Sequence, residues 1–134
     1  MIEYIVFFGL LAAGLLAYIF RPKVEPVLSP VVAERIKCES PIERRLYDAL
    51  AFRGHAVETQ VPCGKYRIDI AIRGARIAIE CDGKAYHSSP EQKAHDRRKN
   101  AYLKEHGWKV LRFSGRQITS SLPHVLSKIE EAVR

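Results

Sequence analysis

Acidic side chains recur at regular spacing in residues 66–87, YRIDIAIRGARIAIECDGKAYH, and this segment offers the clearest chemistry in the chain. Isoleucines alternate with other residues on both sides of Gly74-Ala75, which predicts two β-strands joined by a two-residue type II′ turn. That register places Asp69 directly opposite Glu80, with Asp82 two residues further on the same face, away from the isoleucines. Directly opposed carboxylates repel each other. The pattern therefore predicts a compensating cation, and a divalent metal ion is the obvious candidate.

A solvated sheet face is the simpler alternative. Arg67, Arg73 and Arg76 belong to the same hairpin and could balance the carboxylates without a metal. On the residue pattern alone, this alternative is favoured over a metal site. Asp82-Gly83 is also an ordinary turn dipeptide.

The elements around the hairpin predict a small α/β domain. Ser40-Pro41-Ile42-Glu43 combines an N-cap serine, a proline at N1 and a glutamate at N3, so it begins a helix, which Gly54 ends. The simpler role for Glu43 is therefore structural, as the residue that completes the capping box with Ser40. Further elements are expected as a strand around 56–61, a basic helix over 90–106, a strand over 108–113 and an amphipathic helix over 122–133. The order helix, three strands, helix, strand, helix indicates an α/β or α+β fold with a mixed sheet.

Length and charge restrict the function classes. The 134 residues suit one domain of ordinary size, and the net charge of +7 favours an anionic partner, either nucleic acid or anionic lipid. The three cysteines are scattered and odd in number, which argues against a disulfide framework or a CxxC zinc site.

Residues 4–20 contain no charged side chain and predict a transmembrane anchor. As a helix they would be about 25 Å long, at the short end for a membrane span. A cleaved signal peptide is the alternative, but the chain begins Met-Ile-Glu and has no small-residue cleavage site after the apolar run. Arg21 and Lys23 follow the span, so the positive-inside rule places the N-terminus outside and the basic domain in the cytoplasm, as in a bacterial inner membrane protein.

The chain then divides into an anchor over 1–20, a linker over 21–39 and a folded domain over 40–134. Prolines recur at four-residue spacing in the linker, which favours an extended, semi-rigid tether. Within it, residues 31–37 could form a short helical turn.

Four fragments carry a resemblance to a known family: SPIERRLYDAL, YRIDIAI, IAIECDGKAYH and HDRRKNAYLKEHGWKVLRF. Their order and spacing resemble the restriction-endonuclease-like PD-(D/E)XK superfamily. More narrowly, they resemble its uncharacterised branch, domain of unknown function 559, which is related to very-short-patch-repair endonucleases. The similarity covers roughly residues 40–133. It implies a restriction-endonuclease-like core that hydrolyses phosphodiester bonds with Mg²⁺ or Mn²⁺, in DNA more than in RNA.

The resemblance assigns roles to five residues. Asp69 and Glu80 match the metal-binding acidic residues on the second and third strands. Asp82 stands where most of the superfamily has the lysine of the E-x-K element, so it becomes a further metal ligand or a holder of His87. His87 would replace that lysine in activating or orienting the attacking water. Glu43 matches the first-helix glutamate that reaches the same site.

Basic residues after the hairpin are the expected nucleic-acid contacts. They are Lys84, Arg97, Arg98 and Lys99. A solvated helix face is the usual alternative for such a run. The family often has arginine three residues after Asp96, where this chain has Lys99, and this difference weakens any specific role for the pair. A homodimer is expected if both strands of a duplex are cut.

The sequence therefore predicts a membrane-tethered, metal-dependent nuclease. A catalytically inactive nuclease-fold module that binds nucleic acid at the membrane is the alternative, favoured by the missing E-x-K lysine. A membrane-anchored interaction protein, whose basic face binds lipid or a partner, is a third possibility.

Overall fold

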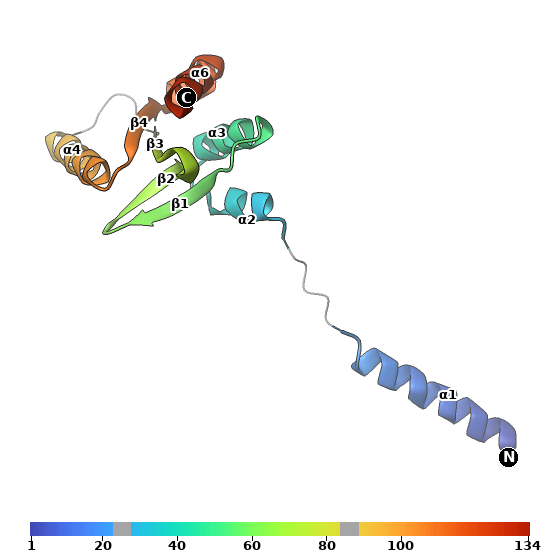
Figure 1. Ribbon diagram of the computed structural model, residues 1–134. Coiled ribbons are helices and arrows are strands. Elements are labelled where there is room, and N and C mark those ends of the chain that lie inside the picture. Colours follow the sequence, from blue (N-terminus) through green and yellow to red (C-terminus); the bar gives the residue numbers. More distant parts are fainter. Residues whose placement is uncertain (23–27, 84–88) are drawn as a thin grey trace.

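A computed structural model describes residues 1–22, 28–83 and 89–134 of the chain (Figure 1). In order, its elements are α1 (Ile2–Ile19), α2 (Pro30–Lys37), α3 (Pro41–Phe52), β1 (Glu58–Cys63), β2 (Tyr66–Ile72), the 3₁₀ turn η1 (Arg73–Ala75), β3 (Ile77–Asp82), α4 (Pro90–Glu105), β4 (Lys109–Ser114), α5 (Gly115–Ser120) and α6 (Leu122–Val133). From α3 onward they follow the predicted order of helix, three strands, helix, strand and helix, with one additional short helix, α5.

The four strands form one mixed sheet in the order β1-β2-β3-β4. β1 and β3 run antiparallel to β2, and β4 runs parallel to β3. Ile70 pairs with Ile79, so Asp69 and Glu80 occupy the next positions along the two strands, in the predicted register. The mixed α/β fold predicted from the sequence is confirmed.

The turn between β2 and β3 differs from the predicted type II′ turn. Arg76, not Gly74, has the positive φ, at 54°. Its guanidinium lies 4.4 Å from the centroid of the Trp108 ring, and its carbonyl oxygen accepts a hydrogen bond from Lys109 N–H at 2.8 Å. These contacts with the start of β4 give a physical reason for the left-handed residue at Arg76.

Helices cover both faces of the sheet (Figure 1). On one face, Ile70, Ile72, Ile77 and Ile79 pack with α3, α5 and α6 in the larger core cluster. On the other face, a smaller cluster joins the sheet to α4. It contains Val61, Ile68, Ala71, Ala78, Leu103 and Trp108. Because Asp69 and Glu80 alternate with the isoleucines of the larger cluster, they belong to the α4 face.

Ile68 is an exception to the predicted isoleucine face, since it packs in the smaller cluster. The turn end of the β1–β2 hairpin lies against α4. There Gly64 has φ of 58°, and a Cβ added to it would lie 2.0 Å from the Tyr102 hydroxyl oxygen.

Part of the predicted linker is helical and packs on the domain: the helical turn suggested for 31–37 is present as α2, so the extended conformation does not apply to residues 30–37. Ser29 caps α2, and Pro30 takes its N1 position. Buried Thr59 on β1 donates two hydrogen bonds to Glu34: N–H to Oε2 at 2.7 Å and Oγ1 to the carbonyl oxygen at 2.6 Å. The Tyr47 hydroxyl on α3 donates to the Val31 carbonyl oxygen at 2.9 Å.

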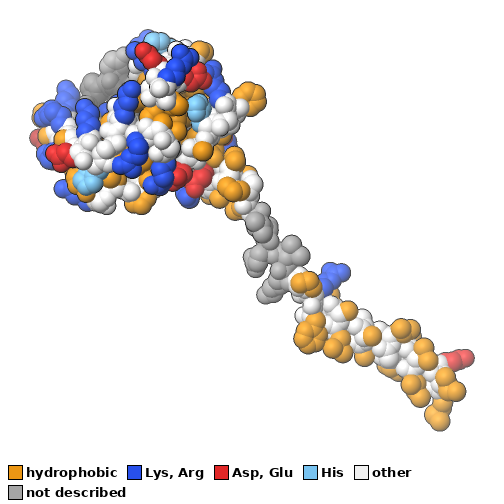
Figure 2. All heavy atoms as spheres, viewed as in Figure 1, with side chains coloured by type: hydrophobic (Ala, Val, Ile, Leu, Met, Phe, Trp, Pro, Cys, Tyr) orange, Lys and Arg blue, Asp and Glu red, His pale blue; other side chains and the backbone are white. Residues whose placement is uncertain are grey.

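Two further elements bear on the predictions. α1 is long and apolar enough to cross a membrane, a property that signal sequences near an N-terminus share, and Figure 2 shows hydrophobic side chains along its length. The short helix α5 was not predicted. Its capping box between Ser114 and Gln117 ends β4 and begins α5.

The attachment of α2 to β1 can be tested with the isosteric substitution Thr59→Val. Loss of the hydroxyl donor should lower the free energy of unfolding by about 1–2 kcal/mol, because a buried acceptor is left without its partner. Chemical denaturation of the full chain measures this. Thr119→Val removes a similar hydroxyl bond from an exposed site on α5 and should cost less than about 0.5 kcal/mol. Equal losses would mean that α2 is not docked on β1.

Candidate active site

Asp69 lies on β2 with one carboxylate oxygen bonded and the other directed away from the sheet backbone. Its Oδ2 accepts a hydrogen bond from the Cys81 N–H of β3 at 2.8 Å. Burial raises the pKa of Asp69, because the charged form loses solvation, and the Cys81 N–H opposes this only in part. Asp69 therefore presents a poorly solvated carboxylate at the α4 face.

Glu80, on the neighbouring strand β3, is only 3% exposed. Its Oε2 accepts a hydrogen bond from the ammonium of Lys99, while its Oε1 is buried and has no hydrogen-bond partner among the described residues. Burial first, and the nearby Asp69 second, raise the pKa of Glu80 to about 7. A buried carboxylate oxygen without a partner is costly. It marks a position that another cation or donor would stabilise.

Lys99 brings a cation into this site from α4. Its side chain is 13% exposed and forms an ion pair with Glu80. The sequence suggested an outward nucleic-acid contact for Lys99 and gave it no specific role. Leu103, one helical turn later, is fully buried in the cluster between α4 and the sheet. This i, i+4 spacing is the sequence signal that places Lys99 on the inner face of α4.

Asp82 is held by Arg112 of the adjacent strand β4. Arg112 Nε and Nη2 donate to the two carboxylate oxygens at 3.0 and 2.7 Å, and the hydrogen bond to Asp82 raises the pKa of Arg112. Arg112 also lies 3.5 Å from Asp96 and donates to Asn100 Oδ1 at 3.1 Å, both on α4. Both oxygens of Asp82 are thus used in a network that joins β3, β4 and α4. The sequence reasoning missed this role of Arg112.

Glu43 lies at the start of α3 and is 7% exposed. Its Oε1 accepts from Ser40 Oγ at 2.9 Å, and its Oε2 accepts from Glu39 N–H at 2.9 Å and from Gln60 Nε2 at 3.1 Å. Ser40 Oγ in turn accepts from Glu43 N–H at 3.2 Å. Ser40 caps the helix as the sequence suggested, whereas the Glu43 carboxylate bonds to Glu39 N–H and Ser40 Oγ and not to the Ser40 N–H of a capping box. The charge of Glu43 also raises the pKa of Asp69. Gln60, which joins Glu43 to β1, was not predicted.

The remaining predicted residues are distributed differently. Lys84 and His87 lie outside the described residues, so the structure does not place them. Arg97 and Arg98 are exposed on α4. Within 1–22, 28–83 and 89–134, no three histidine, cysteine, aspartate or glutamate side chains form a group that could hold a metal ion. Asp69 and Glu80 supply two acidic groups side by side.

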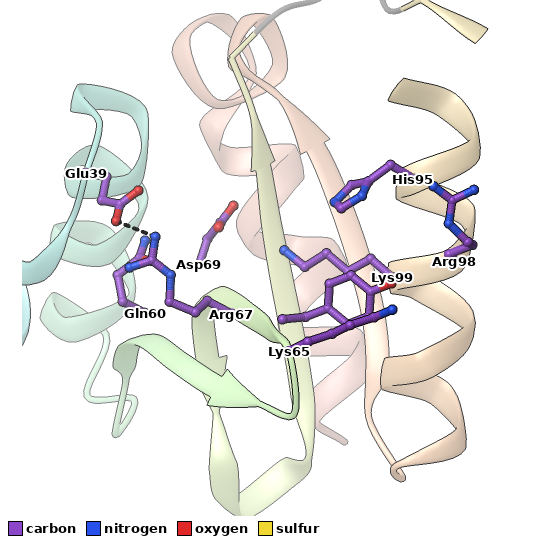
Figure 3. A pocket seen from close by; sticks show the side chains of 9 residues that line it. Glu39, Gln60, Lys65, Arg67, Asp69, His95, Arg98 and Lys99 are labelled. Carbon is purple, nitrogen blue, oxygen red and sulfur yellow. Dashed lines mark ion pairs between the residues drawn. The ribbon is translucent and has the colours of Figure 1, made fainter. Parts of the chain in front are cut away.

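A pocket of about 450 Å³ opens beside this site (Figure 3). Asp69 and Lys99 line it, together with residues of the β1–β2 turn and of α4. The site can therefore bring a buried carboxylate, a partly buried one, a lysine and an open space together at one face of the sheet. This arrangement suits the binding of an anionic substrate beside acidic residues.

Comparisons with known proteins agree with this fold. The catalytic domain of the homing endonuclease I-Bth0305I has a similar fold, with a TM-score of 0.58 and 22% sequence identity over 69% of this chain and 93% of that domain. The uncharacterized protein YcjD of Escherichia coli strain K12 is 33% identical over 90 residues, which cover 65% of this chain and 74% of YcjD. The model of the restriction-endonuclease-like family REase_MTES_1575 matches residues 42–133. The chain therefore belongs to the restriction-endonuclease-like family REase_MTES_1575.

Proposed function

We propose that this protein is a metal-dependent nuclease that hydrolyses phosphodiester bonds, in DNA in preference to RNA. The observation that carries the proposal is the buried Glu80 carboxylate, whose Oε1 has no partner among the described residues, beside Asp69 and Lys99. Membership of a restriction-endonuclease-like family supports the reaction class.

The donor set fits a hard divalent cation. Asp69 and Glu80 would hold Mg²⁺ or Mn²⁺, since carboxylate oxygens are the ligands that these ions prefer. When bound, such an ion supplies positive charge to the phosphate and makes the attacking water more acidic. The free Glu80 oxygen supports this assignment. Asp82 serves as a third ligand only if Arg112 releases one of its oxygens.

Lys99 takes the role that the E-x-K lysine has in related nucleases. Its ammonium lies at the Glu80 carboxylate, where it can hold the attacking water or the phosphate oxygen by a charge-assisted hydrogen bond. Asp82 occupies the sequence position of the E-x-K lysine but is neutralised by Arg112. His87 remains the alternative for orienting the water.

The tether and the setting are part of the proposal. We place the anchor at 1–20, the linker at 21–39 and the nuclease domain at 40–134, with the N-terminus outside and the domain in the cytoplasm of a bacterial cell. The length and apolarity of α1 support the anchor. The Asp82-Gly83 pair supports the branch related to very-short-patch-repair endonucleases. A homodimer would allow both strands of a duplex to be cut.

A catalytically inactive module that binds nucleic acid is the second candidate. The bidentate pairing of Asp82 with Arg112 favours it, because the position of the E-x-K lysine then holds a structural ion pair.

The first test is cleavage of plasmid and oligonucleotide DNA by the full chain in detergent with Mg²⁺ or Mn²⁺. Asp69→Asn should reduce the rate at least about 100-fold, because it weakens a metal ligand, and a chelator should abolish cleavage of the wild type. Asp48→Asn removes a carboxylate paired with Arg35 on the surface and should leave the rate unchanged. Binding without cleavage would select the inactive module.

The second test separates Lys99 from a simple phosphate contact. Lys99→Gln should lower kcat about 100-fold with little change in KM, because the charge acts on the reacting groups. Lys104→Gln, an exposed site on the same helix, is the control and should change neither constant. A raised KM with an intact kcat would instead make Lys99 a substrate-binding residue and leave the catalytic role to His87.

The third test uses the pKa of Glu80 in the metal-free protein. Its folded pKa of about 7 lies above the ordinary value of 4.5, so the wild type should lose stability as the pH rises through that window and then level off. In chelator, the free energy of unfolding of the wild type should fall by about 3 kcal/mol relative to that of Glu80→Gln as the pH rises through this window. Denaturation at pH 5, 6, 7 and 8 measures it.

Mg²⁺ provides the control for this pH series. At pH 8 the ion should restore stability to the wild type and not to Glu80→Gln, because it binds the ionised carboxylate. A stability difference that stays constant across the pH range would contradict the buried, uncompensated Glu80.

A further inference from the structure

The pocket beside Asp69 lies between the β1–β2 turn and α4, and its lining is strongly basic (Figure 3). Four cationic side chains line it, against two carboxylates. The cations are Lys65, Arg67, Arg98 and Lys99. The carboxylates belong to Glu39 and Asp69.

Two of these cations are already neutralised. Arg67 pairs with Glu39 at 2.9 Å, drawn as the dashed line in Figure 3, and Lys99 pairs with Glu80. Lys65 and Arg98 form no ion pair with any residue that the structure describes. The surplus positive charge of the pocket therefore belongs to these two residues. Lys65 comes from the hairpin turn and Arg98 from α4.

The two walls are held together by a close backbone contact. Gly64 precedes Lys65, and any Cβ at this position would lie 2.0 Å from the Tyr102 hydroxyl oxygen of α4. The rings of Tyr66 and Tyr102 also meet edge to face, with centroids 5.3 Å apart. The separation of Lys65 from Arg98 is consequently set before any ligand binds, which reduces the ordering cost of binding.

We propose that Lys65 and Arg98 form a subsite for a backbone phosphate of a nucleic-acid strand, next to the bond that is cut. The inference rests on the proposed nuclease function. It assigns a nucleic-acid contact to Lys65, which is not among the basic residues after β3 that the sequence predicted. Two unpaired cations facing one pocket suit a phosphodiester, and contacts of this kind read no base sequence. The pocket is concave and contains Asp69, so a strand can enter it, whereas a flat anionic membrane surface cannot.

Salt-dependent binding tests the subsite. The full chain in detergent is titrated into a fluorescently labelled oligonucleotide in the presence of chelator, at several salt concentrations. Lys65→Ala and Arg98→Ala should each reduce the slope of log K against log salt by about 1, and the double variant by about 2. Both side chains are exposed, so the fold should persist. With Mg²⁺, the single variants should raise KM and leave kcat unchanged.

Lys104→Ala is the matched control. Lys104 lies on the same helix as Arg98, carries the same charge and is exposed, but does not line the pocket. Its slope should change by much less than 1. An equal change would show that general charge on α4 binds the strand, and would overturn the subsite.

Gly64→Ala tests the fixed separation without removing a charge. It should weaken binding several-fold and lower the slope, because Lys65 moves away from Arg98. Circular dichroism checks that the variant is folded. A folded variant that binds like the wild type would contradict the preset geometry.

The remaining outcomes separate this inference from the nuclease. Binding that depends on Lys65 and Arg98 without any cleavage would remove the proposed activity and leave the subsite standing. Cleavage by the wild type, with normal oligonucleotide binding by the Lys65 and Arg98 variants, would support the nuclease and overturn the subsite. Absence of oligonucleotide binding, or Lys65-dependent binding to phosphatidylglycerol vesicles in its place, would overturn the subsite.

Discussion

The buried carboxylate of Glu80 is the constraint to which the other features of the site respond. A charge at 3% exposure loses most of its hydration, and its partner Asp69 on β2 adds repulsion. One oxygen is stabilised by Lys99, which lies on α4, 19 residues further along the chain. The position of α4 is therefore as important to the site as the strands that bear the carboxylates.

Several independent contacts fix α4 on the sheet. Leu103 and Trp108 pack in the smaller core cluster, and the hairpin turn approaches Tyr102 so closely that a Cβ at Gly64 would displace the Tyr102 side chain. Arg112 links Asp82 on β3 to Asp96 on α4. Hydrophobic packing stabilises α4 on the sheet, while the Gly64–Tyr102 contact and the ion pairs set where the sheet meets α4 along the helix. The same contacts that bring Lys99 to Glu80 also form the walls of the pocket.

The sequence predicted the parts of this arrangement that depend on local pattern. The position of the turn at Gly74-Ala75 predicted the register that brings Asp69 beside Glu80, and the alternating isoleucines excluded a shift of one residue, which would move each of them to the other face. The residue with positive φ in the turn was not predictable, since Arg76 is held by Trp108, which is distant in sequence. A short helical turn over 31–37 was allowed by the sequence, and the observed helix begins one residue earlier because Pro30 takes the N1 position where proline is favoured. The ion pair of Lys99 depends on tertiary packing, and the sequence offered only its spacing from Leu103.

The absence of the E-x-K lysine does not leave the site without positive charge. Asp82 in that position adds a third carboxylate to Asp69 and Glu80, but Arg112 neutralises it from β4, and Lys99 supplies an ammonium from α4. The positive charge of the site thus comes from β4 and α4 and not from the E-x-K position on β3. With all groups ionised, three carboxylates face two cations, and Asp69 accepts a hydrogen bond only from a backbone N–H, with the charge of Lys99 nearby. Burial first, and repulsion from Asp69 second, raise the pKa of Glu80, so the site carries an excess of poorly solvated negative charge. The divalent cation that we propose between Asp69 and Glu80 would compensate this charge, and that compensation is the electrostatic argument for the proposal.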